Sequence, residues 1–481
     1  MGASGTGSAH LTYAAAVAAL QERGRFGIRL GLGRTRAMLR AIGDPQLTLR
    51  GALVAGTNGK GSVLALVASA FRAAGYRVGS TPKPHLVTYR ERLMIDGRPI
   101  DPTTFARLVA EILPVADRVA RRLGEPTEFE LLTAVLFRWF AESGIDVAVV
   151  EVGLGGRLDA THVWDGGVAV ITNVDLDHMA LLGPTIAHIA REKAAIIERG
   201  DVAVTGADGE ALRIVRRRAA RMGVPLTEVA PPPLLAIERD GIVVSLQGLG
   251  RTFVGLRGRH QAANAAVANA TLDALAAAGI ARAGPKARRE GFATASWPGR
   301  LELLRARGRD VLLDGAHNPA GAASLAVALD DLLPLIVSAT GADGGAPAPT
   351  LLMAAMGDKD VEGIVAALAR AGALDRARII CTRLGVPRAA PAERLAAAWA
   401  AVDGRRTVDE ARTIVAEPDV GAALELALGG GSRWEDGPLV VAGSLYLVGE
   451  VRARLVDDPL LRDPEPEDEV TMSTPAPRRP R

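Results

Sequence analysis

Short apolar runs alternate with longer segments of helical spacing along most of this chain. Runs at 52–55, 147–152 and 168–173 have the length of strands and end in glycine or polar residues, a pattern typical of fully buried strands. Segments 102–123 and 128–142 instead repeat apolar residues at the spacing of one helix face, which predicts helices. Strands that alternate with helices predict parallel sheets joined by helical crossovers, so the expected fold class is α/β.

The most specific local pattern is the segment 51–76, which predicts a strand, a glycine-rich turn and a helix. The turn consists of Gly56, Thr57, Asn58, Gly59, Lys60, Gly61 and Ser62. Its glycines let backbone N–H groups converge on an anion at a helix N-terminus, and Lys60 and Ser62 suit terminal phosphates and magnesium. The usual phosphate loop has Ser or Thr directly after the Lys, so a glycine turn with a solvated Lys60 is the alternative.

The alternation of strands and helices is interrupted once and then starts again. We expect a first domain over 10–296, a hinge at 297–300, where Pro and Gly break the pattern, and a second domain over 301–456. The first should be a parallel-sheet, P-loop ATPase-like domain, and the second a smaller open α/β domain. The ends, 1–9 and 457–481, are poor in apolar residues and are expected to be disordered.

Two other predicted strands of the first domain end in polar residues, Glu151 and the pair Asp177-His178. The carboxyl ends of parallel strands form one edge of a sheet, where ligands bind. We therefore expect Glu151, His178 and the phosphate loop to meet there. In isolation, Glu151 could equally face solvent at a strand end, and His178 could be a loop histidine with its hydrogen bonds satisfied.

Composition excludes several classes of protein. Hydrophobic residues make up 48% and aromatic residues 4%, so the cores should consist of Ala, Val and Leu. The net charge of +3 and the dispersed basic residues do not indicate a nucleic-acid partner. The single cysteine, Cys381, excludes an internal disulfide framework. Without a long apolar run or a signal-peptide pattern, we expect a cytoplasmic monomer with no membrane partner.

Several stretches in a fixed order resemble the folylpolyglutamate synthases and dihydrofolate synthases, a family of Mur-type ATP-dependent amide ligases. They include GTNGKGS (56–62), EVGLGGRLDAT (151–161) and LLDGAHNPAGAASL (312–325), and together they extend from about 30 to 450. The resemblance implies a Mur-ligase-type ATP-binding and central domain followed by a Mur-ligase-type C-terminal domain. It also implies addition of L-glutamate to a folate or to dihydropteroate, through an acyl phosphate formed from ATP.

The resemblance further implies ATP and Mg²⁺ as cofactors and assigns roles to individual residues. The residues that would bind ATP are those of the phosphate loop together with Asn264, Arg300 and Asp314. The metal ligands would be Ser62, Glu151 and His178. The catalytic residues would be Lys60, Lys193, His317 and Lys83. The residues that would bind the folate substrate are Leu30, Gly31, Thr127, Phe129, Leu158, Asp159 and Ala160. Since the ATP ligands come from both domains, ATP is expected to bind between them.

Lys193 matches a lysine that is carbamylated in this family, where the new carboxylate helps to hold a second magnesium. From its chemistry alone, a helical lysine beside Glu192 would more often form a surface ion pair.

Three positions depart from the family pattern. Lys83 stands where the family has a magnesium-binding Ser before Pro84-His85, so one metal is either held differently or replaced in charge by Lys83. The alternative is that Lys83 points to solvent. Arg29 stands where members that form dihydrofolate often have Asp, which favours glutamylation of reduced folates over dihydropteroate. His162 replaces the usual Asn, with no consequence that the sequence reveals.

Three other functions remain open at this point. One is a Mur-type ligase that acts on another carboxylate, such as a cell-wall precursor. Another is a catalytically degenerate, nucleotide-binding regulatory protein, which only Lys83 suggests. A third is a plain ATPase, which would release phosphate without glutamate.

Overall fold

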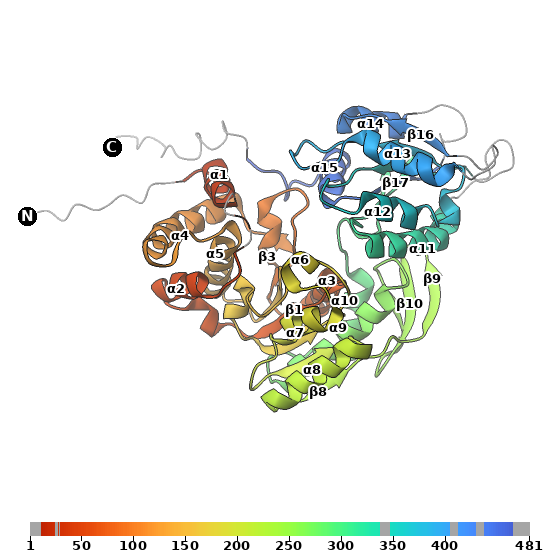
Figure 1. Cartoon of the computed structure of the whole chain (residues 1–481). Helices are drawn as coiled ribbons and strands as arrows, with labels where there is room; N and C mark the ends of the chain where they lie inside the picture. The colour runs from red at the N-terminus through yellow and green to blue at the C-terminus, as the bar shows by residue number, and fades with distance from the viewer. Residues whose placement is uncertain are drawn as a thin grey trace, which may run out of the picture. The chain divides into compact units, whose positions relative to one another are not determined.

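The computed structural model describes residues 11–24, 27, 29–336, 347–404, 412–429 and 437–464. They form two compact units, each with its own sheet (Figure 1). The first unit contains 11–231, 263–291 and 458–464, and the second contains 232–262 and 292–457 within the described ranges. The segment 232–262, placed in the first domain by sequence, thus has its contacts in the second unit. The domain limits and the hinge at 297–300 remain predictions, and the predicted disordered end 1–9 lies outside the described residues.

The helices and strands of the first unit alternate as expected. The helices are α1 (Tyr13–Gly24), α2 (Gly33–Ala41), α3 (Lys60–Ala73), α4 (Pro102–Leu123), α5 (Glu128–Ser143), α6 (Met179–Leu182), α7 (Ile186–Ala194), α8 (Gly209–Met222), most of α9 (Gln261–Ala277) and most of α10 (Pro285–Thr294). The strands are β1 (Gly51–Ala55), β2 (Val78–Thr81), β3 (Met94–Ile95), β4 (Arg98–Pro99), β5 (Val147–Glu151), β6 (Gly167–Ile171), β7 (Val202–Thr205) and β8 (Leu226–Glu228). Short 3₁₀ turns are η1 (Pro45–Thr48), η2 (Tyr89–Arg92) and η3 (Ala160–Val163).

The first sheet has eight strands in the order β4-β3-β2-β5-β1-β6-β7-β8. Strand β1 lies between β5 and β6 and is parallel to both, with Val54 opposite Glu151 and Ala55 opposite Ile171. Only β3 and β4, at one edge, pair in the antiparallel sense. The polar segments that follow β1, β5 and β6 therefore leave the sheet at the same edge.

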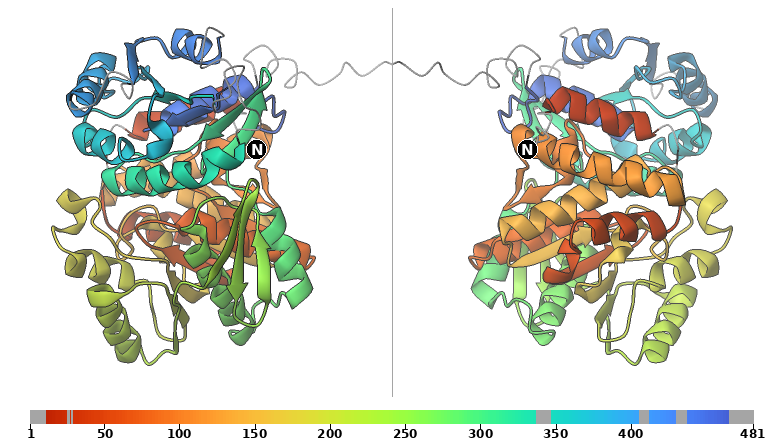
Figure 2. Two further views of the ribbon diagram at one scale, coloured as in Figure 1. Left: turned by 90° about the vertical axis from the view of Figure 1, so that its right-hand side faces the viewer. Right: turned by 90° about the vertical axis from the view of Figure 1, so that its left-hand side faces the viewer.

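Local sequence signals explain where two long helices of this unit begin. Asp101 accepts a hydrogen bond from the N–H of Thr104 at the start of α4, and Pro102 occupies its first position. Thr127 and Glu130 form a reciprocal capping box at the start of α5, as the sequence predicts. Helices α1 and α2 each pack against α4 and α5, which also pack against each other (Figure 2).

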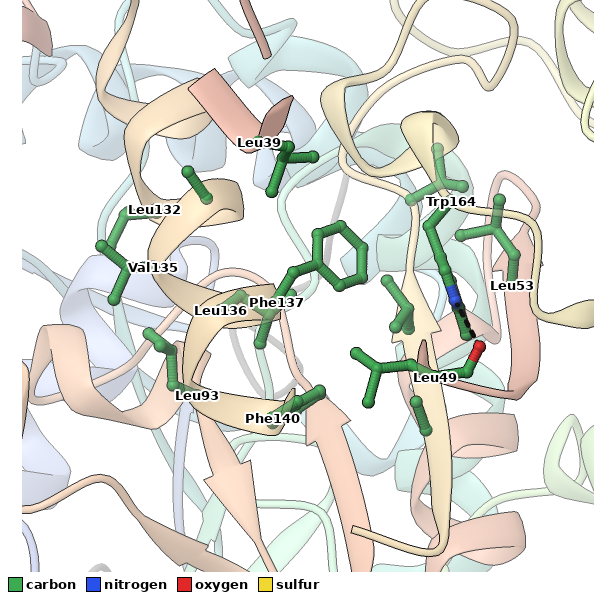
Figure 3. Packing of buried hydrophobic residues seen from close by; sticks show 14 of the residues in the cluster. Leu39, Leu49, Leu53, Leu93, Leu132, Val135, Leu136, Phe137, Phe140 and Trp164 are labelled. Carbon is green, nitrogen blue, oxygen red and sulfur yellow. Dashed lines mark hydrogen bonds between the residues drawn. The ribbon is translucent and has the colours of Figure 1, made fainter. Parts of the chain in front are cut away.

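The core of the first unit joins this helical group to the sheet. Trp164 is buried, and its indole N–H donates to the carbonyl oxygen of Leu49 at 3.1 Å (Figure 3). Its ring lies 5.8 Å from that of Phe137 on α5. Burying one large apolar side chain contributes about 1.5–3 kcal/mol. Trp164 thus connects helix α5 to the segment that precedes β1.

The second unit has two sheets. Its strands are β9 (Leu234–Glu238), β10 (Gly241–Leu246), β11 (Gly250–Val254), β12 (Glu302–Ala306), β13 (Arg309–Leu313), β14 (Thr350–Met353), β15 (Arg378–Cys381), β16 (Thr413–Ala416) and β17 (Leu439–Ala442). Its helices are α11 (Pro319–Ile336), α12 (Val361–Leu368), α13 (Ala392–Asp403), α14 (Val420–Leu428) and α15 (Leu445–Leu455), with the 3₁₀ turn η4 (Gly372–Leu374). Strands β9 to β11 form an antiparallel meander. The larger sheet, in the order β12-β13-β17-β14-β15-β16, is parallel except for β12.

Helix α11 is long and apolar enough, by length and composition, to cross a membrane, and no other helix of the described residues is. Its residues Leu325, Leu329 and Leu332 are buried in the core of the second unit. We therefore describe α11 as a core helix.

The two α/β units, each built around a mainly parallel sheet, confirm the predicted fold class. The segment after α15 differs from expectation. Residues 458–464 belong to the predicted disordered tail, yet Arg462 and Asp463 make hydrogen bonds in the first unit. The tail from 465 onward lies outside the described residues.

Candidate active site

The phosphate loop is held in place by the segment that follows β6. The N–H groups of Thr57 and Asn58 donate to the carbonyl oxygen and the side-chain Oδ1 of Asn173, at 3.1 and 2.8 Å. The hydroxyl of Thr172 donates to the carbonyl oxygen of Asn58 at 2.6 Å. These hydrogen bonds hold the loop against the segment that follows β6.

Helix α9 reaches the same loop. Gly59 has a φ of 80°, and a Cβ built on it would lie 2.2 Å from Oδ1 of Asn264. Only glycine fits both this backbone conformation and this close approach. The structure therefore places Asn264 against the phosphate loop, although more than 200 residues separate them in the chain.

Two lysines converge on the carbonyl oxygen of Gly56. The ammonium of Lys60 donates to it at 3.0 Å and also to the carbonyl oxygen of Thr57 at 3.0 Å, while Lys193 on α7 donates to it at 2.8 Å. Lys193 is 5% exposed. Burial, followed by the nearby charge of Lys60, lowers the pKa of Lys193 to about 7. Lys193 therefore does not form the surface ion pair that was its alternative.

A pocket opens at this edge of the first unit. It is lined by Gly56, Thr57, Lys60, Val152, Gly153, Leu154, Gly155, Asp177, His178, Leu182 and Lys193. The phosphate loop, the end of β5 and the segment after β6 all contribute to its wall. Sequence reasoning did not select Asp177 or the backbone of 152–155 as site residues, although a carboxylate beside His178 and a glycine-rich strand end were available signals.

The three candidate metal ligands differ in exposure. Ser62 and Glu151 are 6% and 4% exposed, at the start of α3 and the end of β5, whereas the His178 side chain is 45% exposed. His178 also has a left-handed backbone, with φ of 49°. A carboxylate and a hydroxyl oxygen suit Mg²⁺, and an imidazole suits it less. The oxygen donors therefore fit magnesium, and of the three candidates only His178 borders the pocket.

Lys83 does not point to solvent. Its ammonium donates to the carbonyl oxygen of Glu151 at 2.5 Å and lies 4.4 Å from the centre of the Phe129 ring. The residue as a whole is half-buried, but its ammonium is enclosed by protein atoms, and this burial lowers the pKa of Lys83 to about 8. The carboxylates of Asp159 and Glu151 oppose the lowering. A cation thus lies beside the candidate metal ligand Glu151.

The candidate folate-binding residues lie on three segments that the structure brings together. The N–H of Gly31 donates to the carbonyl oxygen of Leu158 at 3.3 Å, which joins the loop of Leu30 to that of Ala160. A Cβ on Gly153 would lie 2.9 Å from the Phe129 ring and 3.1 Å from the Asp159 carboxylate. Glycine at this position leaves room for both side chains.

Local hydrogen bonds already engage two of these candidates. The Thr127 hydroxyl caps α5, and Asp159 accepts from the N–H groups of Leu154 and Thr161. Arg34 binds Glu130 and the carbonyl oxygen of Arg29. These contacts order the segments around the site before any substrate binds.

The second unit has its own group of candidates at the end of β13. The carboxylate of Asp314 accepts from the N–H groups of Leu301 and Ala316, both at 2.9 Å. A Cβ on Gly315 would lie 2.1 Å from the guanidinium of Arg300, and His317 Nδ1 lies 2.8 Å from the carbonyl oxygen of Gly315. Arg300, Asp314 and His317 therefore form one cluster.

Sequence reasoning missed His260 in this cluster. Burial lowers its pKa, the charge of Asp314 opposes this effect, and the charge of Arg300 adds to it. The motif HQAANAAVA begins with His260 and could have directed attention to it. The remaining candidate for ATP, Asn264, lies in the first unit.

Two family models match the chain. Residues 102–272 match the Mur ligase middle domain, and residues 300–455 match the C-terminal domain of dihydrofolate synthetase. A dihydrofolate synthase/folylpolyglutamate synthase from Mycobacterium tuberculosis is 36% identical over 471 residues, which cover 89% of this chain and 90% of that protein.

Solved structures agree. Mycobacterium tuberculosis folylpolyglutamate synthase complexed with ADP has a TM-score of 0.79 at 32% identity, and covers 93% of this chain and 100% of that one. Escherichia coli FolC in complex with DHPP and ADP has a TM-score of 0.75 at 28% identity, and covers 93% and 98%. With its matched domains and its 36% identity over most of both chains, this chain belongs to the folylpolyglutamate synthase/dihydrofolate synthase family of Mur-type ligases.

Proposed function

We propose that this chain is an ATP-dependent ligase that adds L-glutamate to a folate, with dihydropteroate as a second candidate acceptor. The proposal rests on the residues that meet at one edge of the first sheet. There the phosphate loop, Lys60 and Lys193 border one pocket, and Gly153, next to Leu154 in its wall, adjoins Phe129 and Asp159. A nucleotide phosphate and an acceptor carboxylate could therefore lie close together.

The proposed reaction has two steps. A carboxylate oxygen of the folate attacks the γ-phosphorus of ATP, which forms an acyl phosphate and releases ADP. The amine of glutamate then attacks the acyl carbon, phosphate leaves, and the amine loses a proton. Phosphoryl transfer depends on positioning and positive charge, which Lys60 and the backbone N–H groups of the loop supply.

Ser62, Glu151 and His178 would hold magnesium, which supplies positive charge to the phosphate oxygens. Lys83 would supply a fixed positive charge beside Glu151, in place of one metal. The enclosed ammonium of Lys83 and its 2.5 Å hydrogen bond to the Glu151 backbone support this role. An ammonium cannot ligate a cation. Either the Lys83 ammonium or a magnesium ion would therefore occupy this location, but not both.

We also propose that Lys193 carries a carbamate. Its neutral amine would attack CO₂, forming an N–C bond and releasing one proton. Burial favours this reaction because it favours the neutral amine, and a pKa of about 7 leaves a substantial neutral fraction at physiological pH. The resulting carboxylate would lie near the Gly56 carbonyl oxygen, where an additional cation would stabilise it.

For the other assigned residues, we propose the roles that the family resemblance implies. Asn264 would contact the nucleotide at the phosphate loop, and Arg300, Asp314 and His317 would contact ATP or its transferred phosphate. The folate would lie along Leu30, Gly31, Thr127, Phe129, Leu158, Asp159 and Ala160. We place the reaction in the cytoplasm and the enzyme as a monomer.

The test is a pair of incubations of the full chain with Mg-ATP and L-glutamate, one with tetrahydrofolate and one with dihydropteroate. Product mass and released phosphate are both measured. Addition to tetrahydrofolate alone is expected if Arg29 disfavours the dihydropteroate acceptor, and addition to both would establish two activities. Phosphate release without glutamate would indicate an ATPase. No product with either acceptor, despite ATP binding, would overturn the proposal. Lys60→Met provides the inactive control.

A further inference from the structure

The segment after α15 makes specific contacts with a turn of the first unit. Asp463 accepts a hydrogen bond from the Thr88 hydroxyl at 2.6 Å and one from Nε of Arg90 at 3.1 Å. The guanidinium of Arg90 also donates to the carbonyl oxygen of Arg462 at 2.7 Å. The Tyr13 hydroxyl lies 2.9 Å from that of Thr88. Three distant parts of the chain thus meet at one turn.

The contact with Asp463 pairs the buried positive charge of Arg90 with a carboxylate. Arg90 is 3% exposed, and removing the partner of a buried charge leaves an uncompensated ion, which is strongly unfavourable. Among the residues that the structure describes, Arg90 pairs with one carboxylate, that of Asp463, 373 positions later. Its remaining hydrogen bonds go to the carbonyl oxygens of Ile100 and Arg462.

The turn that holds Arg90 is continuous with the loop of Lys83. Glu91 accepts from the N–H groups of Leu86, Val87 and Thr88, so its carboxylate holds the end of that loop. In the same turn, Nε of Arg92 donates to Nδ1 of His85 at 2.8 Å. The contacts of η2 therefore hold residues 85–88, the part of the loop that follows Lys83.

Side chains of this loop face the acceptor region of the site. Lys83 contacts Glu151 and Phe129, and Arg92 pairs with Glu128 in the first turn of α5. His85 packs on Tyr89 with ring centres 4.5 Å apart. A shift of η2 would move these groups relative to α5, and a misplacement of about 1 Å can cost about a hundredfold in rate.

We propose that residues 458–464 form a strap that positions the loop 83–88 for the acceptor substrate, with Asp463 as its positioning residue. This inference rests on the proposed function for the identity of the acceptor. The strap acts through Arg90 and Thr88 and does not touch the reacting atoms.

The test compares Asp463→Ala with the matched control Asp458→Asn. Asp458 lies in the same strap, but its carboxylate accepts from the N–H of Leu460. A chain that ends after 464 keeps the strap, and a chain that ends after 457 removes it. Each variant is assayed for the KM of tetrahydrofolate, the KM of ATP and the hydrogen exchange of the amides of 86–88.

Asp463→Ala and the chain ending after 457 are expected to raise the KM of the folate about tenfold or more. The KM of ATP should stay within about twofold, and the amides of 86–88 should exchange faster. Asp463→Glu should restore part of the loss, because it returns a carboxylate to Arg90. Asp458→Asn and the chain ending after 464 should match the full chain.

Unchanged hydrogen exchange of the amides of 86–88, together with an unchanged folate KM, in Asp463→Ala would overturn the proposed role of the strap. An equal loss for folate and ATP would also overturn it, since that pattern indicates general destabilisation. If the full chain ligates no folate, the proposed function fails while hydrogen exchange still tests the strap. Faster exchange in the strap variants would then support it, and unchanged exchange would reject it.

Discussion

Lys60 and Lys193 donate hydrogen bonds to the same atom, the carbonyl oxygen of Gly56, at 3.0 and 2.8 Å. The positive charge of Lys60 beside this acceptor favours the neutral form of Lys193. Burial has the larger effect, and the two together lower the pKa of Lys193 to about 7. The surroundings of the phosphate loop thus also lower the pKa of the Lys193 amine.

Lys60→Met should alter Lys193 as well as turnover. Turnover should fall about a hundredfold or more, because a positive charge aimed at the transferred phosphoryl group is lost. The pKa of Lys193 should rise, so less carbamate should form from ¹³C-bicarbonate at about pH 7 than in the unmodified chain. The measurement is the ¹³C carbamate signal. Equal signals would show that Lys60 does not influence Lys193.

The carbamate itself is tested with Lys193→Met and the matched control Lys286→Met. Lys286 is exposed on α10. The ¹³C signal should disappear in Lys193→Met and remain in Lys286→Met. Turnover of Lys193→Met should fall together with the signal. A signal that survives in Lys193→Met would place the modification elsewhere.

Stability should depend on pH through Lys193 in CO₂-free buffer. Between about pH 7 and 10 the unfolded chain keeps a proton on this lysine that the folded chain has lost, because the folded pKa is about 7 and the ordinary value is 10.5. The free energy of unfolding should therefore rise with pH, by up to about 1.4 kcal/mol per pH unit. The rise is measured by denaturant unfolding as the difference between the unmodified chain and Lys193→Met. A difference that is flat over this range would contradict the buried neutral amine.

Lys83→Met tests the fixed charge beside Glu151. We expect kcat to fall by about tenfold to a hundredfold, because the enclosed ammonium would no longer stabilise the developing phosphate charge. Lys286→Met again provides the control. The assay is repeated at higher magnesium as a rescue, since a metal ion could occupy the location of the lost ammonium. Full activity of Lys83→Met at low magnesium would remove Lys83 from the catalytic residues.

Comparing Gly59→Ala with Gly75→Ala separates the effect of backbone strain from the effect of a steric contact with Asn264. Both glycines flank α3 with positive φ, 80° and 86°, so each alanine costs about 1–2 kcal/mol in conformation. Only at Gly59 would the new Cβ meet a side chain, that of Asn264. ADP affinity, measured by calorimetry, should fall about tenfold for Gly59→Ala and stay unchanged for Gly75→Ala. Equal affinities in the two variants would mean that Asn264 does not restrict the phosphate loop.

Local signals in the sequence predicted most of the elements that carry the site. The capping box of Thr127 and Glu130, the start of α4 at Pro102 and the strand, loop and helix around Lys60 all depend on neighbouring residues. Each could be read from spacing alone. The prediction that β1, β5 and β6 end at one edge also holds, because crossover helices impose parallel strands.

By itself, then, the sequence determined the α/β class, the main elements and the phosphate loop, since these follow from hydrophobic period and from turn and cap residues. Only the tertiary structure decided that Asn264 meets Gly59, that Lys83 turns inward to Glu151, and that Asp463 pairs with Arg90. It also assigned the meander 234–254 to the second unit. These contacts join residues far apart in the chain, and they depend on how whole elements pack, which no local spacing records.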